Sequence, residues 1–219
     1  ARVVDKLLSS TAFGERWARH WLDLTGYADQ IGTSNNVFAE HAWRYRDYVI
    51  RAFNSDKPFD DFIREQVAGD LLPASAQEKR AENLTATGFL VLGDVEIVAV
   101  DKLKMEHDLV DQQVSKIGTA FLGLTLGCVR CHDHKFDPIA QTDYYALAGI
   151  FRSTEPFQDE NRNATMWWEF PVPQGPGREP LTVMAPKESS PRNLRVHLRG
   201  NRFTLGCSQR RAFGFLLGG

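Results

Sequence analysis

The stretch DKLKMEHDLVDQQVSKIGTAFL, residues 101–122, carries the longest helical pattern of apolar side chains in this chain. One stripe of the pattern comprises Leu103, His107, Val110, Val114, Ile117 and Phe121. Apolar residues that recur every three or four positions occupy one face of an α-helix. The stretch therefore predicts a long helix, and shorter segments of the same kind predict that residues 1–155 are mainly α.

The same periodicity predicts shorter helices on both sides of this stretch. Ser10 and Thr11 can cap a helix whose apolar face carries Trp17, His20, Trp21 and Leu24. A second helix over residues 43–53 is expected to turn inward Tyr45, Tyr48, Val49, Ala52 and Phe53. Further helices are expected near residues 58–67, 77–92 and 141–151, and a loop over residues 27–40. The many Asp and Glu residues fit the exposed surfaces of these helices.

The composition changes after Pro156. Residues 171–180 are rich in Pro and Gly, which is typical of a linker or irregular loop. Residues 181–184 and 194–198 alternate weakly and predict short strands. We therefore expect a helical domain over residues 1–155 and an extension over residues 156–219 that is partly β or irregular.

Shortly after the long helical stretch the chain reads Cys128-Val129-Arg130-Cys131-His132. Two cysteines two residues apart with histidine next are the attachment pattern for a c-type haem. Each thiol adds to one vinyl group of the porphyrin, and the imidazole of His132 becomes the proximal iron ligand. Chance would produce this pattern in roughly one in a thousand chains of this composition. The sequence thus predicts one covalent haem c.

Other interpretations of the cysteine pair remain open. Cys128 and Cys131 could bind zinc or iron, with His134 as a further ligand, although no second cysteine pair follows. The pair could also be inert or form a disulfide. Asp133 and Asp137 either belong to a solvated turn or orient the second ring nitrogen of a histidine.

The second axial ligand of a haem would decide its chemistry. Two strong protein ligands favour electron transfer, whereas an open position lets the iron bind or activate small molecules. His20 and His107 both lie on apolar helical stripes and are the candidate distal ligands, as alternatives to being core histidines. Met105 lies off the stripe, and His41 is expected at the surface. Haem propionates need cationic or hydrogen-bonding partners, for which Arg130 and Tyr45, within Arg44-Tyr45-Arg46, are candidates.

Composition excludes several classes of function. The formal net charge of −2 gives no general attraction to nucleic acid or anionic membranes. No segment approaches the ~20 apolar residues of a membrane span. Three cysteines, two of them in one motif, fit cofactor attachment better than a disulfide framework. The chain begins at Ala1 without a signal peptide, so we expect a processed protein or a fragment.

Several blocks of the chain resemble a known family. They are RWARHWLD (16–23), YRDYVIRAFN (45–54), KPFD (57–60), EQVAGDLLP (65–73), FLGLT (121–125), CVRCHDHKFDP (128–138) and DYYALAGIF (143–151). In this order they resemble the planctomycete cytochrome-type domain of unknown function, the second of the cytochrome-like domains named for that group. The resemblance covers about residues 1–155. It implies an irregular helical, c-type cytochrome-like domain from a larger exported protein, often beside a separate cytochrome-like domain.

The resemblance also bears on individual residues. His20 lies inside a family block, whereas His107 occupies a position where an apolar residue is more typical, which favours His20 as distal ligand. The stretch around Cys207 departs from the family pattern, so a functional role for Cys207 is not expected. We expect a haem c electron-transfer domain in the periplasm or outside the cell, with a redox partner protein or neighbouring cytochrome domain. The alternatives are a haem-dependent oxidative enzyme, in this setting one acting on carbohydrate, and a non-haem metal or interaction module.

Overall fold

Contacts within the chain divide it into two compact units that interleave along the sequence. The first unit comprises Ala1–Val100 and Pro156–Pro186, and the second comprises Asp101–Glu155 and Lys187–Gly219. The computed structural model describes residues 2–32, 37–98, 100–155, 157–158, 166–173, 179–189, 194–200 and 205–208. We expected a sequential division after residue 155, whereas the segments that follow this residue are divided between both units.

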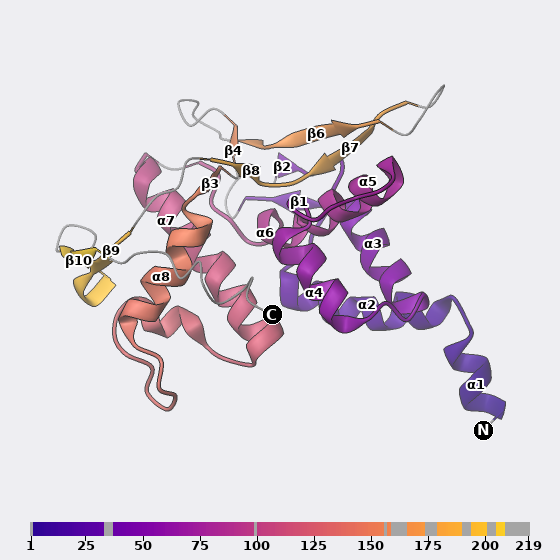
Figure 1. Cartoon of the computed structure of the whole chain (residues 1–219), viewed down its shortest axis with the longest axis horizontal. Coiled ribbons are helices and arrows are strands. Elements are labelled where there is room, and N and C mark those ends of the chain that lie inside the picture. The colour runs from indigo at the N-terminus through magenta and orange to yellow at the C-terminus, as the bar shows by residue number, and fades with distance from the viewer. Residues whose placement is uncertain are drawn as a thin grey trace. The chain divides into compact units, whose positions relative to one another are not determined.

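Most of the regular secondary structure of the first unit is helical (Figure 1). They are α1 (Arg2–Leu8), α2 (Ala12–Thr25), α3 (Trp43–Asn54), α4 (Phe59–Ala68), α5 (Gln77–Ala86) and α6 (Gly88–Val91). In α3 the predicted inward face is confirmed for Tyr45, Tyr48, Val49 and Ala52, which are buried, whereas Phe53 is half-buried. The single helix expected over residues 77–92 is instead two, α5 and α6, separated at Thr87.

Helix α2 buries a face that shares only Trp21 with the apolar stripe that its spacing indicated. Its buried residues are Gly14, Ala18, Trp21 and Thr25. Trp17 and Leu24 are 49% and 41% exposed. A Cβ atom added to Gly14 would lie 2.5 Å from the Ile50 carbonyl oxygen, so α2 approaches α3 closely at this glycine. Small side chains together with Trp21, rather than the whole apolar stripe, therefore form the inward face of α2.

Aromatic rings form the core where α2, α3 and α4 meet. The Trp21 and Phe62 ring centroids are 4.8 Å apart, and Phe62 stacks on Tyr48 at 5.8 Å. The indole N–H of Trp21 donates to the Tyr45 hydroxyl at 3.0 Å and to Gln66 Oε1 at 2.8 Å. Buried polar atoms are thereby satisfied within the aromatic cluster, as a stable core requires.

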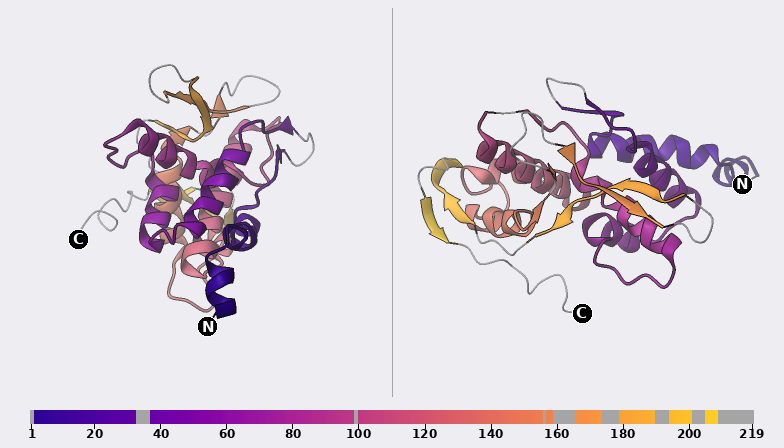
Figure 2. Two further views of the ribbon diagram at one scale, coloured as in Figure 1. Left: turned by 90° about the vertical axis from the view of Figure 1, so that its right-hand side faces the viewer. Right: turned by 90° about the horizontal axis from the view of Figure 1, so that it is seen from above.

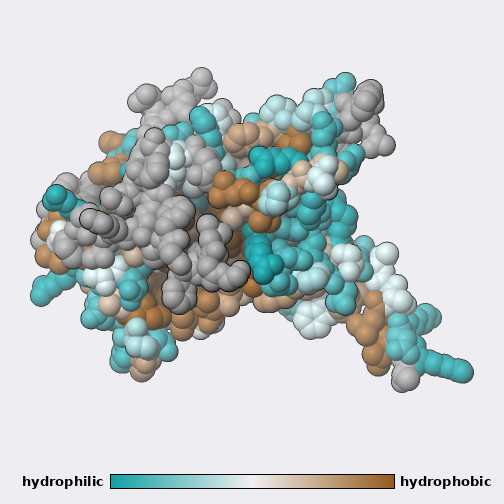
Figure 3. Space-filling view, in the orientation of Figure 1, coloured by the Kyte–Doolittle hydropathy of each residue, from teal (hydrophilic) through white to brown (hydrophobic). Residues whose placement is uncertain are grey.

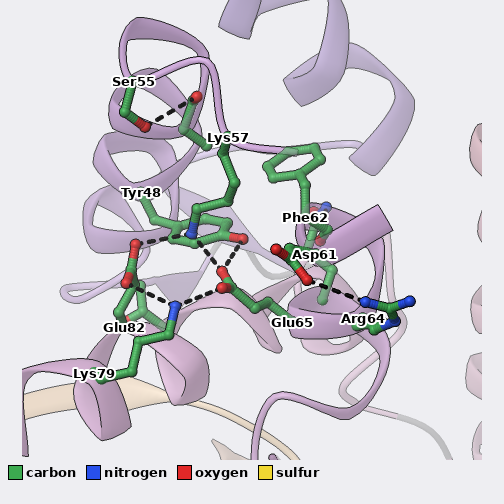
Figure 4. A network of polar contacts seen from close by, with 12 residues as sticks. Tyr48, Ser55, Lys57, Asp61, Phe62, Arg64, Glu65, Lys79 and Glu82 are labelled. Carbon is green, nitrogen blue, oxygen red and sulfur yellow. Dashed lines mark hydrogen bonds and ion pairs between the residues drawn. The ribbon is translucent and has the colours of Figure 1, made fainter. Parts of the chain in front are cut away.

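A polar network lies beside these rings (Figure 4). Glu65 is only 4% exposed, and its carboxylate accepts hydrogen bonds from Lys57 Nζ at 2.5 Å, Lys79 Nζ at 2.6 Å and the Tyr48 hydroxyl at 2.8 Å. Glu82 contacts the same two lysines at 2.9 and 3.2 Å. The expectation that the acidic residues lie on helix surfaces is therefore wrong for Glu65.

A β-hairpin covers α5 in the first unit. Strands β6 (Glu169–Val172) and β7 (Leu181–Met184) pair antiparallel, and β7 is one of the two predicted strands. Ala81 and Leu84 of α5 pack into a buried cluster with Val172, Val183 and Ala185. Two-residue strands form the pairs β1 (Gln30–Ile31) with β2 (Val37–Phe38) and β4 (Phe157–Gln158) with β5 (Met166–Trp167). Figure 2 shows the β6–β7 hairpin in two further directions.

The second unit is built on α7 (Lys102–Ile117) and α8 (Gln141–Phe151). The predicted long helix is confirmed, although its last turn, Gly118–Leu122, is π-helical. Among its described residues the second unit also contains the 3-10 helices Leu126–Arg130 and Leu198–Gly200, the pair β3 (Thr154–Glu155) with β8 (Lys187–Glu188), and β9 (Arg195–His197) with β10 (Leu205–Ser208). The strand predicted at residues 194–198 is β9. The Cys207 side chain, residues 174–178 and the tail from residue 209 lie outside the described part.

The chain is thus mainly helical with a few short strands. Helix α1 turns apolar side chains outward, namely Val3, Val4, Leu7 and Leu8, which appear as a brown patch in Figure 3. Among the residues described, no helix is both long and apolar enough to cross a membrane.

Candidate functional site

The cysteine motif begins within the 3-10 helix Leu126–Arg130 of the second unit. Leu126 and Val129 are buried and hold this helix inward, whereas Cys128 and Cys131 are exposed and form no disulfide. The Cys131 amide donates to the Cys128 carbonyl at 3.3 Å, which continues the 3-10 turn through the second cysteine. Residues three apart in such a turn lie on the same side, so both thiols face one side of the motif.

Two glycines allow the motif to lie close against its neighbours. A Cβ atom on Gly127 would lie 2.7 Å from Ser115 Oγ of α7. A Cβ atom on Gly118 would lie 2.7 Å from Leu126 Cγ. A larger side chain at Gly118 would also meet the backbone, 2.8 Å from the Leu124 carbonyl oxygen, whereas at Gly127 it would displace the Ser115 hydroxyl.

The Arg130 side chain ties the motif to α7. Its Nη1 atom lies 3.0 Å from Asp108 Oδ1 and 3.5 Å from Asp111 Oδ2. Partial burial opposes the charge, but these two carboxylates outweigh it and raise the pKa of the Arg130 guanidinium. The Tyr144 hydroxyl donates to Asp111 Oδ1 at 2.5 Å. The guanidinium therefore already has protein partners, and a haem propionate would have to compete with Asp108 and Asp111 for it.

Replacing Arg130 by glutamine is expected to destabilise the second unit by about 1–3 kcal/mol, because partly buried Asp108 and Asp111 lose their common partner. Thermal unfolding of the full chain measures this. Arg46→Gln is the matched control, since its pair with Asp47 has side chains 39% and 34% exposed and should cost at most about 1 kcal/mol. Equal losses in both variants would contradict a supporting role for Arg130.

Helix α8 holds the backbone of the motif. Gln141 Nε2 donates to the Arg130 carbonyl at 2.8 Å, and the Tyr145 hydroxyl donates to the same oxygen at 3.2 Å. The Gln141 amide donates to Asp133 Oδ1 at 2.8 Å. Arg130, which precedes the second cysteine, and Asp133, which follows His132, are therefore both anchored on the first turns of α8.

His132 is exposed, and its ring is oriented by the next residue. Nδ1 lies 2.7 Å from the Asp133 carbonyl oxygen. Since a carbonyl oxygen can only accept, this hydrogen bond requires the proton on Nδ1, which leaves the lone pair on Nε2. A backbone carbonyl is one of the usual partners of the non-ligating nitrogen of a metal-bound histidine. It is the carbonyl of Asp133, not its carboxylate, that orients this ring.

His134 has a different role. Its side chain is only 6% exposed, and Nδ1 accepts from the Asp137 amide at 3.0 Å. Nε2 lies 3.2 Å from Thr125 Oγ1, to which it donates in the neutral ring. The Asp137 carboxylate lies 2.9 Å from Nδ1, where a further proton would form an ion pair. Both ring nitrogens therefore hold the loop that follows the motif, as hydrogen-bonding groups.

Comparison with known protein families shows that the cysteine motif lies within a family match. Residues 1–156 match the family model PSCyt2, which is described as a protein of unknown function (DUF1549). The chain belongs to the PSCyt2 family. No curated protein and no solved structure matches it.

Tyr45 of this PSCyt2 chain lies in the core of the first unit. It is 2% exposed, and its hydroxyl contacts both Trp21 and Gln66. Burial raises its pKa, so the phenol stays protonated. These contacts fix Tyr45 as a core residue in the first unit, with its hydroxyl already used.

The candidate distal ligands occupy different units. His20 is exposed on α2 of the first unit, and its ring packs edge-on against Trp17 with centroids 5.4 Å apart. His107 lies on α7 of the second unit, half-buried, with its ring 4.8 Å from that of His197. Met105 is buried. Of the two histidine rings, that of His20 is the more exposed to solvent.

His197 is a residue that sequence reasoning missed. It is 6% exposed in β9, and its ring lies 5.2 Å from that of Tyr145. Its carbonyl accepts from Gln141 Nε2 at 3.0 Å, the same amide that binds the Arg130 carbonyl. Only a weak alternation around residue 197 marked the strand, and nothing in it indicated contact with the motif.

A metal site built from the motif alone finds no support in the geometry. Among the described residues no group of three or more His, Cys, Asp or Glu side chains is placed to hold a metal ion. His134, the expected third ligand beside Cys128 and Cys131, uses both ring nitrogens within its own loop.

Proposed function

We propose that this PSCyt2 chain binds one haem c through Cys128 and Cys131, with His132 as the proximal iron ligand, and transfers electrons. The observation that carries the proposal is the arrangement of these three residues. Two exposed thiols that form no disulfide are separated by one 3-10 turn, and the adjoining imidazole is exposed with its Nδ1 proton bound to a carbonyl. The residues thus fit the demands of a covalently attached porphyrin.

Attachment requires only thiol chemistry from this chain. The sulfur of each cysteine forms a bond to one carbon of a vinyl group, and the thiol hydrogen goes to the other carbon, so no oxidant is needed. His132 offers Nε2 to the metal, and the Asp133 carbonyl holds Nδ1–H and thereby the ring orientation. Bound haem supplies an iron that cycles between ferrous and ferric states.

The electron-transfer role assumes a second protein ligand, for which His20 is the leading residue and His107 the alternative. With an open position the same haem would support oxidative chemistry, including on carbohydrate. Covalent haem attachment takes place outside the cytoplasmic membrane, so the proposal places the chain in the periplasm or outside the cell. Its partner would be a redox protein or a neighbouring cytochrome domain of a larger exported protein.

Expression together with cytochrome maturation machinery tests the attachment. We expect a pyridine haemochrome spectrum and a haem mass that survives denaturation in the wild-type chain. The Cys128→Ser/Cys131→Ser double variant should lose the covalent haem entirely, whereas Cys207→Ser, outside the motif, should keep it. Wild-type chain without haem, in cells that mature a control cytochrome, would contradict the proposal.

Oxidised and reduced absorption spectra then separate electron transfer from oxidative catalysis. We expect a low-spin spectrum that does not change on adding carbon monoxide or cyanide, and a change to high spin in His20→Ala. A wild-type spectrum that responds to both ligands would instead favour the oxidative enzyme. If only His107→Ala alters the spin state, the distal ligand is His107.

A further inference from the structure

A segment outside the family match lies directly against the cysteine motif. A Cβ atom added to Gly200 would be 2.6 Å from Cys131 Sγ and 3.9 Å from the Arg130 carbonyl oxygen. Real Cβ atoms are essentially never found so close to another heavy atom, so a larger residue at position 200 would displace the Cys131 sulfur from its present position. The match to the PSCyt2 family ends at residue 156, whereas Gly200 belongs to the same compact unit as the motif.

Residues 195–200, here called the cover segment, are held in place by the residues that hold the motif. Gln141 Nε2 bridges the Arg130 carbonyl at 2.8 Å and the His197 carbonyl at 3.0 Å. The Tyr145 hydroxyl is within 3.2 and 3.4 Å of the same two oxygens. One pair of α8 side chains thus fixes the distance between cover segment and motif.

The backbone of the cover segment bends sharply beside Cys131. Arg199 and Gly200 both have positive φ, 53° and 72°. Left-handed residues are routine for glycine and uncommon for others, so consecutive ones mark a backbone shape that the surroundings impose. Here the hydrogen bonds at the His197 carbonyl and the contact of Gly200 with Cys131 surround these two residues.

We propose that the cover segment is part of the attachment site and that Gly200 determines whether Cys131 can be alkylated as well as Cys128. Cys131 is exposed, and the absence of a side chain at Gly200 lets its sulfur keep its position. The part of this inference that concerns haem attachment rests on the proposed function. The part that concerns the alkylation of Cys128 and Cys131 does not.

Alkylation of the haem-free full chain with iodoacetamide tests the geometry. Each thiolate displaces iodide, and peptide mass spectrometry gives the initial rates at Cys128 and Cys131. Gly200→Ala should lower the Cys131-to-Cys128 rate ratio by roughly tenfold, as overpacking of a close contact implies. An unchanged or higher ratio overturns the proposal.

Gly123→Ala is the matched control. Gly123 has φ of 66°, close to that of Gly200, but a Cβ atom there would meet nothing within 4 Å. Both variants therefore carry a similar backbone penalty, and only one crowds a thiol. Equal falls in the ratio in the two variants would assign the effect to backbone strain and overturn a specific role for Gly200.

A second measurement leaves Gly200 intact, which covers the case in which Gly200→Ala fails to fold. In Cys128→Ser, alkylation of Cys131 should speed hydrogen exchange at the amides of residues 195–200. In Cys131→Ser, alkylation of Cys128 should leave that exchange unchanged. An equal change in hydrogen exchange of residues 195–200 in the two alkylated variants would contradict the contact between the cover segment and Cys131.

Haem attachment provides the spectroscopic readout. A porphyrin held by one thioether keeps one vinyl group, so its pyridine haemochrome band lies at longer wavelength than that of the doubly attached form. Gly200→Ala should shift the band to that of Cys131→Ser, and Gly123→Ala should match wild type. A Gly200→Ala band at the wild-type position overturns the part that concerns haem attachment. Wild-type chain without haem would refute the proposed function, while the alkylation ratios still decide the geometry.

Discussion

Glu65→Gln is expected to lower the free energy of unfolding of the first unit by about 3–5 kcal/mol, the usual loss when one partner of a buried ion pair is removed. The Glu65 carboxylate is 4% exposed and is the common acceptor for Lys57, Lys79 and Tyr48. Glutamine keeps the volume but leaves two ammonium groups with one remaining carboxylate, that of Glu82. Urea unfolding followed by tryptophan fluorescence measures the loss.

Glu82→Gln is the matched control for this change. Glu82 contacts the same two lysines, but its side chain is 32% exposed, so water compensates much of the loss. We expect a cost of about 1 kcal/mol or less, as for other exposed ion pairs. Equal costs in the two variants would show that burial of Glu65 does not set the strength of the network.

The same network gives a pH dependence with a defined sign. Burial alone would raise the pKa of Glu65, but hydrogen bonds from Lys57, Lys79 and Tyr48 outweigh it and hold this pKa below its ordinary value of 4.5. The unfolded state therefore takes up the proton first as the pH falls. Stability from Glu65 is full above about pH 4.5 and is lost progressively below it. Acid titration should be less steep in Glu65→Gln than in the wild-type chain.

His132→Ala and His134→Ala are expected to have opposite effects, although only one residue separates the two histidines. His132 is exposed, so its removal should leave stability within about 0.5 kcal/mol of wild type. Under the proposed function the bound iron would lose its proximal ligand, and the low-spin spectrum would disappear. Imidazole added to the solution should restore it in part.

His134→Ala should leave the iron spectrum unchanged and reduce stability. Loss of the acceptor for the Asp137 amide and of the donor to Thr125 should cost about 1–3 kcal/mol. Thermal unfolding and absorption spectra of the two haem-loaded variants decide the assignment. Loss of the low-spin spectrum in His134→Ala, with His132→Ala unaffected, would exchange the roles proposed for the two residues.

Local patterns predicted those elements whose buried face repeats with the helical period or whose ends carry a local capping residue. Helix α3 turns inward Tyr45, Tyr48 and Val49, as its spacing indicated. The Asp143 carboxylate accepts the Ala140 amide at 2.9 Å at the start of α8, where a helix start was expected. Both features depend on residues at most a few positions apart, so a single sequence contains the information.

Contacts between distant segments were not predictable in the same way. In α2 the face with small residues, Gly14 and Ala18, packs inward, since close approach to α3 outweighs the burial of Trp17. Glu65 resembles any surface carboxylate until the fold brings Lys57 and Lys79 beside it. Such pairings depend on the path of the chain rather than on the spacing of residues.

The candidate site shows the same limit. Its reactive residues follow from the cysteine spacing, and the role of Asp133 as a partner of His132 is partly anticipated. His197 and Gly200 lie 66 and 69 residues after Cys131 in the sequence, and the weak strand signal over residues 194–198 gave no reason to place them at the motif. A glycine that matters because of one sulfur atom leaves no pattern in a single sequence.

The interleaving of the two units has a practical consequence for anyone cloning this domain. A gene fragment cut at residue 156, where the family match ends, would remove β7 from the apolar side of α5. The same cut would discard His197 and leave Tyr145 and Gln141 without one of their acceptors. The solubility and the thiol reactivity measured on such a shortened protein would therefore both differ from those of the full chain, because the segments that support them would be missing.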